Sequence, residues 1–590
     1  MREQLNALRR EMKAKGIDAY LIPTTDFHGS EYVNEYFTCR KFMSGFTGSA
    51  GTLLVTDTWA GLWTDGRYFL QAEAQLAGSG IDLMKEREPG VPAIEDYLSG
   101  HLPAGSCLGF DGRVVSCRQA EPFAQRYRLK WNADLVGEIW KDRPPLCAKP
   151  IYEIPLSVTG ETAESKLHRL RAAMKEAGAQ MHLITRMEEI AWLYNLRGSD
   201  VENTPVFFSF FLALPEGERL YVLDPDFPHS AAASHLPAST EVQPYFQIFE
   251  DLKSLPAGKL LLCRDEVSYA MVCDLPGQVE VVDGRDPAEW MKAFKNETEI
   301  RCTKAAHLRD GAAMVRFLCW LKQAAAESVR AGGTGRIGEL TEIDAADYLK
   351  KCRMAQKGYK DLSFATIAGY GANGAIIHYD PTPETNAPLQ PEGFLLVDSG
   401  GQYEDGTTDI TRTIALGPLT REMKENYTCV LKSHIALATA RFPEGTTGAQ
   451  LDQMTRRPLL EKGLNYNHGT GHGVGHLLSV HEGPNTISPR GEESRILAGM
   501  ITSDEPGVYL AGQYGIRLEN EILCRKGKDG MLEFEPLTWC PWEPEAILPE
   551  MLTDTETQWL NEYHRQVREK LVPLLDEETA SWLEKETAEI

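Results

Sequence analysis

The N-terminal part of the chain carries one pattern of hydrophobic and polar positions twice. In each copy, apolar residues at helical spacing precede a glycine and then a short apolar run, at residues 8–22 and again at 170–184. This order predicts a helix, a glycine at its C-terminal end and a buried strand. The copies share seven identities at one constant offset: Leu8, Arg9, Met12, Lys13, Gly16, Leu21 and Ile22 recur as Leu170, Arg171, Met174, Lys175, Gly178, Leu183 and Ile184. Because the offset has no gaps, we favour duplication over a chance match and predict two related α/β domains.

Changes in composition mark the edges of these domains. The proline-rich segment 141–155 predicts an extended linker, because proline fits neither a helix interior nor a central strand. A second boundary is expected near residues 284–287, and the stretch from Trp290 to about Ala326 then predicts a long helix. We therefore expect α/β domains at 1–148 and 149–293, a different third domain at 294–530, and a C-terminal extension of that domain at 531–590.

The third domain begins its strand-rich part with a predicted hairpin. Residues 393–398 form an apolar run that is typical of a buried strand, and residues 404–406 are a turn signal. Residues 407–414 then alternate with β-branched side chains, as in a strand. A helix is predicted from about Thr420 to Arg441. The C-terminal extension starts with aromatic and proline-rich sequence and is expected to end in a helix and an acidic tail.

Composition narrows the classes of function. The 590 residues contain 61 Lys and Arg against 85 Asp and Glu, a formal net charge of −24. This balance argues against nucleic-acid and membrane partners, since phosphate contacts need basic residues, and it permits divalent cations. No run of 18 apolar residues predicts a membrane span, and the charged first helix does not resemble a signal peptide. The twelve cysteines form no C-x-x-C pair, which is typical of a reduced cytosolic protein.

Histidine and glycine are concentrated in one short segment. Four of the fourteen histidines lie at His468, His472, His476 and His481, and glycine occupies positions 469, 471, 473 and 475. Alternating glycines argue against a helix. They predict an extended segment whose backbone packs closely against another part of the chain. A tight structural turn with surface histidines is the alternative, but this density of histidine favours a functional site.

Carboxylates supply the second group of candidates. Asp398 ends one hairpin strand and Asp409 lies on the next, so the hairpin can bring them together. Two buried carboxylates would repel each other unless a metal ion lay between them. Further along, Pro506 holds Glu505 in an extended conformation. The alternation of residues 516–519 places Arg517 and Glu519 on one face of a strand, where an ion pair is the simpler interpretation.

Taken in order, these residues resemble a known family. The set Asp398, Asp409, His472, Glu505 and Glu519 is similar to the five-ligand dinuclear motif of the pita-bread metallopeptidases. The flanking sequence agrees, in Val-Asp398-Ser-Gly, Asp409-Ile-Thr-Arg-Thr, His468-Gly-Thr-Gly-His472, Glu505-Pro-Gly and Arg517-Leu-Glu519-Asn. The resemblance implies two creatinase-type N-terminal α/β domains followed by a pita-bread catalytic domain.

The length and layout resemble one branch of that family. Two N-terminal domains, a catalytic domain and an extension are similar to the long, three-domain form of aminopeptidase P, and segments 46–51 and 63–69 fit it. This resemblance implies a cytoplasmic homodimer that removes the first residue from peptides with proline at the second position. It also implies two divalent ions as cofactors, with manganese favoured because a site of four carboxylates and one imidazole is rich in oxygen.

The resemblance also implies a role for each residue. Asp409 and Glu519 would bridge the metals, Asp398 would bind one, and His472 and Glu505 would bind the other. Catalysis is expected to use a hydroxide that bridges the metals, with Glu505 taking the proton from the attacking water. His378 and His481 would contact the substrate, stabilise the tetrahedral intermediate and protonate the leaving proline nitrogen. The two remaining assignments are His468 in the proline pocket and Arg517 as the group that orients a ligand carboxylate.

Three alternatives stay open at this point. A prolidase, which cuts only dipeptides, carries the same ligands but is usually shorter. A metal-free hydrolase of the creatinase type keeps the fold without the ligand set, and the five ligands argue against it. A pita-bread module that binds proteins without catalysis has also lost its ligands, which the complete set here again disfavours. His476 has no catalytic counterpart in the family, and we expect it to be structural.

Overall fold

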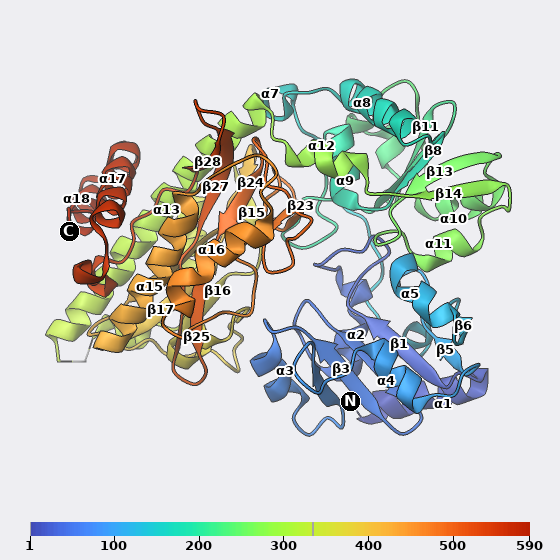
Figure 1. The fold of residues 1–590 in the computed structure, drawn as a ribbon, viewed down its shortest axis with the longest axis horizontal. Coiled ribbons are helices and arrows are strands. Elements are labelled where there is room, and N and C mark those ends of the chain that lie inside the picture. The colour runs from blue at the N-terminus through green and yellow to red at the C-terminus, as the bar shows by residue number, and fades with distance from the viewer. Residues whose placement is uncertain (1, 333–334) are drawn as a thin grey trace. The chain divides into compact units, whose positions relative to one another are not determined.

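The computed structural model describes residues 2–332 and 335–590. Their contacts divide the chain into two compact units, residues 1–289 and 290–590 (Figure 1). No helix among the described residues is long and apolar enough to cross a membrane. Each unit is described below by itself.

The first unit contains two six-stranded sheets of the same design. The first has the order β4-β3-β2-β1-β5-β6 and the second β12-β11-β10-β8-β13-β14, and equivalent strand pairs run in the same relative directions. The strands of the first are β1 (Ala19–Pro23), β2 (Thr52–Thr56), β3 (Ala60–Thr64), β4 (Asp82–Lys85), β5 (Cys107–Gly109) and β6 (Arg128–Lys130). Those of the second are β8 (Met181–Ile184), β10 (Ser209–Ala213), β11 (Glu218–Val222), β12 (Thr240–Pro244), β13 (Gly258–Leu262) and β14 (Val279–Asp283). The shared topology confirms the predicted repeat.

The repeated sequence forms the predicted elements in both copies. Helix α1 (Arg2–Lys15) is followed by Gly16 and then β1, and helix α8 (Ala163–Glu176) is followed by Gly178 and then β8. Both glycines have positive φ, 66° and 70°, which ends each helix without the strain a side chain would add. Of the predicted linker 141–155, residues 141–151 contain no helix or strand, whereas Tyr152–Glu153 form the short strand β7, which pairs with β9 (Leu196–Arg197).

Two helices lie around the start of the second unit, where one was predicted. Helix α12 (Pro287–Ala293) ends before Phe294, and α13 runs separately over Glu297–Arg330. The break occurs because Asn296 caps α13: its side chain accepts from the backbone N–H of Glu299, and the Glu299 side chain accepts from that of Asn296. The prediction of one uninterrupted helix from Trp290 was therefore wrong, although the Asn-x-x-Glu signal is present in the sequence.

The strands of the second unit form two sheets that carry the candidate ligands. One has the order β16-β17-β20 and the other β21-β28-β27-β24-β22-β23. The first is built from β16 (Ile367–Tyr370), β17 (Phe394–Ser399) and β20 (Ile410–Ala415). The second contains β21 (Arg441–Phe442), β22 (Gly471–Gly473), β23 (Glu482–Ile487), β24 (Ile501–Asp504), β27 (Asn520–Lys526) and β28 (Leu532–Pro536). A separate ribbon of β25 (Gly507–Leu510) and β26 (Tyr514–Arg517) contacts the first sheet.

The predicted hairpin is present, with an addition at its tip. Strands β17 and β20 pair antiparallel, and Asp398 lies opposite Thr411. Between them, β18 (Gly401–Tyr403) and β19 (Gly406–Thr407) pair with each other and join β15 (Tyr359–Leu362) in a small sheet. Helix α15 (Arg421–Ala438) follows, capped by Thr420, and α16 (Gly448–Leu460) comes next.

The C-terminal extension packs on the long helix α13. It contains α17 (Asp554–Leu571) and α18 (Glu577–Glu586), which lie beside α13 (Figure 1). The predicted acidic tail contains α18, and its Leu583 is buried in the core of the unit. Apolar residues at helical spacing therefore anchor this part of the chain despite its acidic surface.

Candidate metal centre

Strand alternation separates an apolar face from a carboxylate face in the hairpin. Leu395 and Val397 of β17, with Ile410 and Ile414 of β20, join the buried cluster around α13. Because successive side chains point to opposite faces, Asp398 and Thr411 project from the other face. Asp409 was predicted to lie on the second strand, but it lies just before β20, two residues before Thr411. Asp398 and Asp409 are 8% and 3% exposed. The hairpin therefore buries both carboxylates on one side, as predicted.

The histidine segment approaches from the second sheet, and its glycines allow the contact. A Cβ atom on Gly471 would lie 2.0 Å from the carbonyl oxygen of Ser503, and one on Gly473 would lie 2.2 Å from that of Glu482. Only glycine fits strand β22 between its two neighbours, so His472 is held close to β24. Its Nε2 atom lies 3.6 Å from Oδ2 of Asp409.

Two glutamates complete the group, each between two strands. Glu505 lies between β24 and β25, and its Oε1 is 3.4 Å from Nε2 of His472. Glu519 lies between β26 and β27, so the predicted single strand through residues 516–519 is interrupted. Its Oε2 accepts a 2.6 Å hydrogen bond from the Thr411 hydroxyl, and its backbone N–H donates to the Thr411 carbonyl. These bonds join the ligand segments of the two sheets.

Burial, followed by the crowding of acids, determines the electrostatics of this site. Burial raises the pKa of Asp409 well above its ordinary value, and the charge of Glu519 raises it further. Burial and the Asp398 charge do the same to the pKa of Glu519. Burial raises the pKa of Glu505 to about 7, partly opposed by Arg517. Such mutual repulsion destabilises the protein unless a cation or protons neutralise the group.

The donor set fits divalent metal ions. One ligand atom from each of Asp409, His472 and Glu519 lies within 4.8 Å of the others. Among the described residues, the buried Oδ1 atoms of Asp398 and Asp409 have no hydrogen-bond partner. Buried carboxylate oxygens are rarely left unsatisfied, and here they point to a positive charge that the side chains do not supply.

Arg517 links this cluster to His468 through Tyr509, a residue for which the sequence predicted no role. Its guanidinium donates to Oδ2 of Asp398 over 2.7 Å and to the hydroxyl of Tyr509 over 2.8 Å. The same hydroxyl is 2.8 Å from Nε2 of His468. The predicted position of Arg517 beside a candidate ligand agrees with this contact. Tyr509, through Arg517, therefore connects the candidate ligand Asp398 to His468 of the predicted proline pocket.

The other predicted histidines occupy different places. The His481 ring packs edge-on against His472, with centroids 4.3 Å apart, and His481 lies immediately before β23. His378 is half-buried in the turn after residues 371–375, a segment that contacts β26. His476 is buried, with Nδ1 3.2 Å from the Thr303 hydroxyl of α13, which fits a structural role.

A fifth buried acid supports the cluster and was not predicted. Glu521 is fully buried, and its Oε1 accepts a 2.8 Å hydrogen bond from the backbone N–H of Asp409. Its Oε2 lies 3.2 Å from Nε2 of the buried His307 in α13. The sequence does contain a signal, because Arg517, Glu519 and Glu521 follow one another at intervals of two. The partner His307 lies more than 200 residues away and leaves no local trace.

Four family models together match nearly the whole chain. A model described as metallopeptidase family M24 matches residues 301–526, and the C-terminal region of peptidase M24 matches 530–590. Two models of the creatinase/prolidase N-terminal domain match residues 4–143 and 142–299.

Curated proteins resemble the chain over its full length. Aminopeptidase P2 of Arabidopsis thaliana is 40% identical, with 98% of this chain and 87% of the relative covered. A probable Xaa-Pro aminopeptidase P of Coprinopsis cinerea is 37% identical over 100% of this chain and 98% of the relative. Among solved structures, an X-prolyl aminopeptidase of Caenorhabditis elegans superposes with a TM-score of 0.93 at 33% identity, covering 100% of this chain and 99% of that one. That protein is described as a cytosolic enzyme with a di-nuclear active site.

Proposed function

This chain belongs to metallopeptidase family M24, among the aminopeptidases P, and on that premise we propose that it releases the first residue from peptides whose second residue is proline. The observation that carries the proposal is the group of Asp398, Asp409, His472, Glu505 and Glu519, in which Asp398, Asp409 and Glu519 are buried and the other two are half-buried. Relatives of full length that are named Xaa-Pro aminopeptidases support the choice of substrate.

Two divalent ions fit this group as cofactors. We assign Asp409 and Glu519 to both ions, Asp398 to one, and His472 with Glu505 to the other. The short distances from Nε2 of His472 to the carboxylates of Asp409 and Glu505 support the second assignment. When bound, the ions would supply Lewis-acid chemistry that lowers the pKa of water, so that a nucleophile is available at neutral pH. The oxygen-rich donors favour Mn²⁺ over softer metals.

The chain's own residues handle protons and position the peptide. Glu505 is suited to take the proton of the attacking water, because its Oε1 lies 3.4 Å from Nε2 of the candidate ligand His472. His481, packed against His472, and His378 stabilise the charge that develops on the carbonyl oxygen and deliver a proton to the proline nitrogen. Protonation matters because that nitrogen leaves as a secondary amine. His468 lines the proline pocket, and Tyr509 and Arg517 fix its position relative to Asp398.

The cellular location and the oligomeric state of the enzyme are also part of the proposal. We place it in the cytoplasm as a homodimer, with peptides as its partners. The cytosolic description of the structural relative supports the location. Sedimentation of the purified protein tests the dimer, which is contradicted if the mass corresponds to 65.8 kDa.

A peptide panel tests the activity. The protein would be loaded with Mn²⁺ and given Arg-Pro-Pro, Ala-Pro and Ala-Ala-Ala, and release of the first residue would be followed by chromatography. We expect cleavage of Arg-Pro-Pro and none of Ala-Ala-Ala. Cleavage of Ala-Pro alone would make the protein a prolidase. Failure to cut Arg-Pro-Pro with two ions bound would refute the proposed function.

A further inference from the structure

One buried cation in the second unit is held entirely by uncharged groups. Arg412 of β20 is 2% exposed, and a guanidinium at such depth normally pairs with a carboxylate. Here all of its hydrogen bonds go to neutral oxygens. The acceptors are the carbonyl oxygens of Thr411, Glu519, Cys540 and Pro541, the amide oxygen of Asn520 and the hydroxyl of Tyr563. This side chain therefore serves to fix backbone rather than to neutralise an acid.

One side of the guanidinium donates hydrogen bonds to the segment that carries Glu519. Its Nη1 donates to the Glu519 carbonyl over 2.6 Å, and its Nη2 donates to the Asn520 side chain over 2.9 Å. Arg412 is three residues from Asp409 on the same hairpin and projects from the face of β20 opposite to Thr411. It thus ties the backbone of one candidate bridging ligand to the strand next to the other, from behind the carboxylates.

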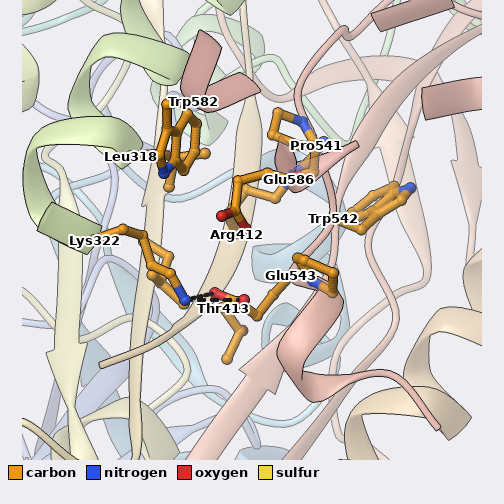
Figure 2. A pocket seen from close by; sticks show the side chains of 11 residues that line it. Leu318, Lys322, Arg412, Thr413, Pro541, Trp542, Glu543, Trp582 and Glu586 are labelled. Carbon is orange, nitrogen blue, oxygen red and sulfur yellow. Dashed lines mark hydrogen bonds and ion pairs between the residues drawn. The ribbon is translucent and has the colours of Figure 1, made fainter. Parts of the chain in front are cut away.

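The other side of the guanidinium is enclosed by the C-terminal extension. Its Nε donates to Pro541 over 3.0 Å and its Nη2 to Cys540 over 2.8 Å. The guanidinium carbon lies 3.8 Å from the ring centroid of Trp542, in cation–π contact. Figure 2 shows Arg412 among Pro541, Trp542 and Glu543. The Tyr563 ring of α17 stacks on Trp542, and this aromatic layer closes the cage.

A hydrogen bond secures the same extension to the same strand three residues further on, and an ion pair joins the extension to α13. Lys322 of α13 lies 3.0 Å from Oε2 of Glu543, drawn as dashed lines in Figure 2. Oε2 of Glu543 also accepts a 3.0 Å hydrogen bond from the backbone N–H of Ala415. Both attachments are nearly dry, with the Lys322 and Glu543 side chains 12% and 7% exposed. Strand β20 is therefore held to residues 540–543 at two points.

We propose that Arg412 is a positioning residue for the metal centre, and that residues 540–543 of the C-terminal extension, acting through it, set the spacing of the Asp409 and Glu519 carboxylates. The inference rests on the metal site under the proposed function. Two acids that repel each other tend to move apart, and a rigid backbone behind them resists that motion. Groups that orient metal ligands typically change metal affinity by about 10–100-fold when they are lost.

Substitution of Arg412 tests this directly in the full-length chain. Arg412→Lys keeps the charge but cannot reach acceptors on both sides. After chelation, titration with MnCl₂ by calorimetry should show binding of at least one ion weakened by about 10–100-fold. The Mn²⁺ concentration for half-maximal activity should rise by the same factor, while kcat at saturating Mn²⁺ recovers. Trp582→Phe is the matched control, because Trp582 lines the same pocket and its variant should bind Mn²⁺ as the wild type does.

A second variant distinguishes the proposed positioning role of Arg412 from a general loss of folding. Trp542→Leu leaves Arg412 in place and removes the ring over its guanidinium, on which Tyr563 also stacks, so it should weaken Mn²⁺ binding in the same direction. Unchanged Mn²⁺ affinity in either folded variant, with or without a lower melting temperature of the metal-free protein, would overturn the inference and leave Arg412 purely structural. If the wild type itself binds no Mn²⁺, the proposed function fails instead, and the two failures are thereby distinguished.

Discussion

Single residues at the centre show two different uses of a buried charge. Asp409 carries a buried oxygen without a hydrogen-bond partner among the described residues and shares its surroundings with four further acids. Under the proposed function it accepts a cation. Glu521 is equally buried, but its Oε1 accepts a hydrogen bond from a backbone N–H and its Oε2 lies 3.2 Å from Nε2 of His307. Both are acids in the same cluster, and only their contacts separate a candidate ligand from a support.

His481 should affect rate without affecting metal binding. It packs against His472 but is not among the candidate ligands, so His481→Ala should lower kcat by about 10²–10⁴-fold, the usual range for a general acid. Its Mn²⁺ content, measured after dialysis by atomic absorption, should match that of the wild type. Asp409→Asn provides the contrast, since it should lose both metal and activity. Full turnover by the His481 variant would refute its assigned role.

The raised pKa of Glu505 predicts how pH affects the metal-free protein. The folded pKa of about 7 exceeds the ordinary value of 4.5, so the folded state holds its proton more tightly than the unfolded state. Stability is therefore lost as pH rises from about 4.5 through about 7. Bound cations remove this loss by replacing the proton. The gap in melting temperature between Mn²⁺-loaded and chelated protein should widen between pH 5 and pH 8, and a constant gap would contradict the prediction.

Among the elements, β22 depends most directly on its sequence. It has only three residues, two of which are glycines, and it runs between β23 and β24 with His472 at its centre. Side chains at the glycine positions would strike backbone atoms, which cannot move without displacing a neighbouring strand. The position of one candidate ligand is therefore set by the absence of side chains on either side of it.

Gly473→Ala should displace this strand. The added Cβ would lie 2.2 Å from the Glu482 carbonyl oxygen and 2.6 Å from Oδ1 of Asn485. We expect a loss of about 1–3 kcal/mol in the free energy of unfolding, as for other overpacked sites, together with weaker Mn²⁺ binding. Denaturant unfolding and calorimetric titration would measure the two effects. Gly338→Ala, where a Cβ meets no atom within 4 Å, should change neither. Equal behaviour of the two variants would contradict this account of β22.

At the scale of the whole molecule, the candidate chemistry belongs to one unit. All five candidate ligands lie between residues 398 and 519, within the second unit of residues 290–590. The first unit consists of the two related creatinase-type domains, as the sequence predicted and the family models confirm. Metal binding should therefore stabilise the two units unequally.

Scanning calorimetry with and without a chelator tests this asymmetry. An ion at about 1,000 times its Kd stabilises the state that binds it by about 4 kcal/mol. Removing Mn²⁺ should lower the transition of the second unit and leave that of the first in place, because the two need not unfold as one. Equal shifts of both transitions, or a single shifted transition, would show that the units unfold together.

The sequence by itself determined the plan of the protein. The repeat could be recognised because a helix, the glycine that ends it and the strand that follows are all local patterns in the sequence. The candidate ligands could be recognised because their signals are also local: the alternating glycines and the short segments around Asp398, Asp409, Glu505 and Glu519. Even the misplaced helix start had a local signal, the cap formed by Asn296 and Glu299. Such features depend on neighbours within a few residues, which is what a sequence states directly.

Only the tertiary structure decided which atoms meet. Thr411 and Glu519 bond across 108 residues, Arg412 reaches Pro541 across 129, and His307 reaches Glu521 across more than 200. Each of these contacts depends on how two sheets and a C-terminal extension pack, and packing is set by the sum of many apolar contacts along the whole unit. No short pattern distinguishes Arg412 from an ordinary charged strand residue, and the interval of two that includes Glu521 does not identify its partner His307. Their support of the carboxylates exists only once distant backbones have been brought together.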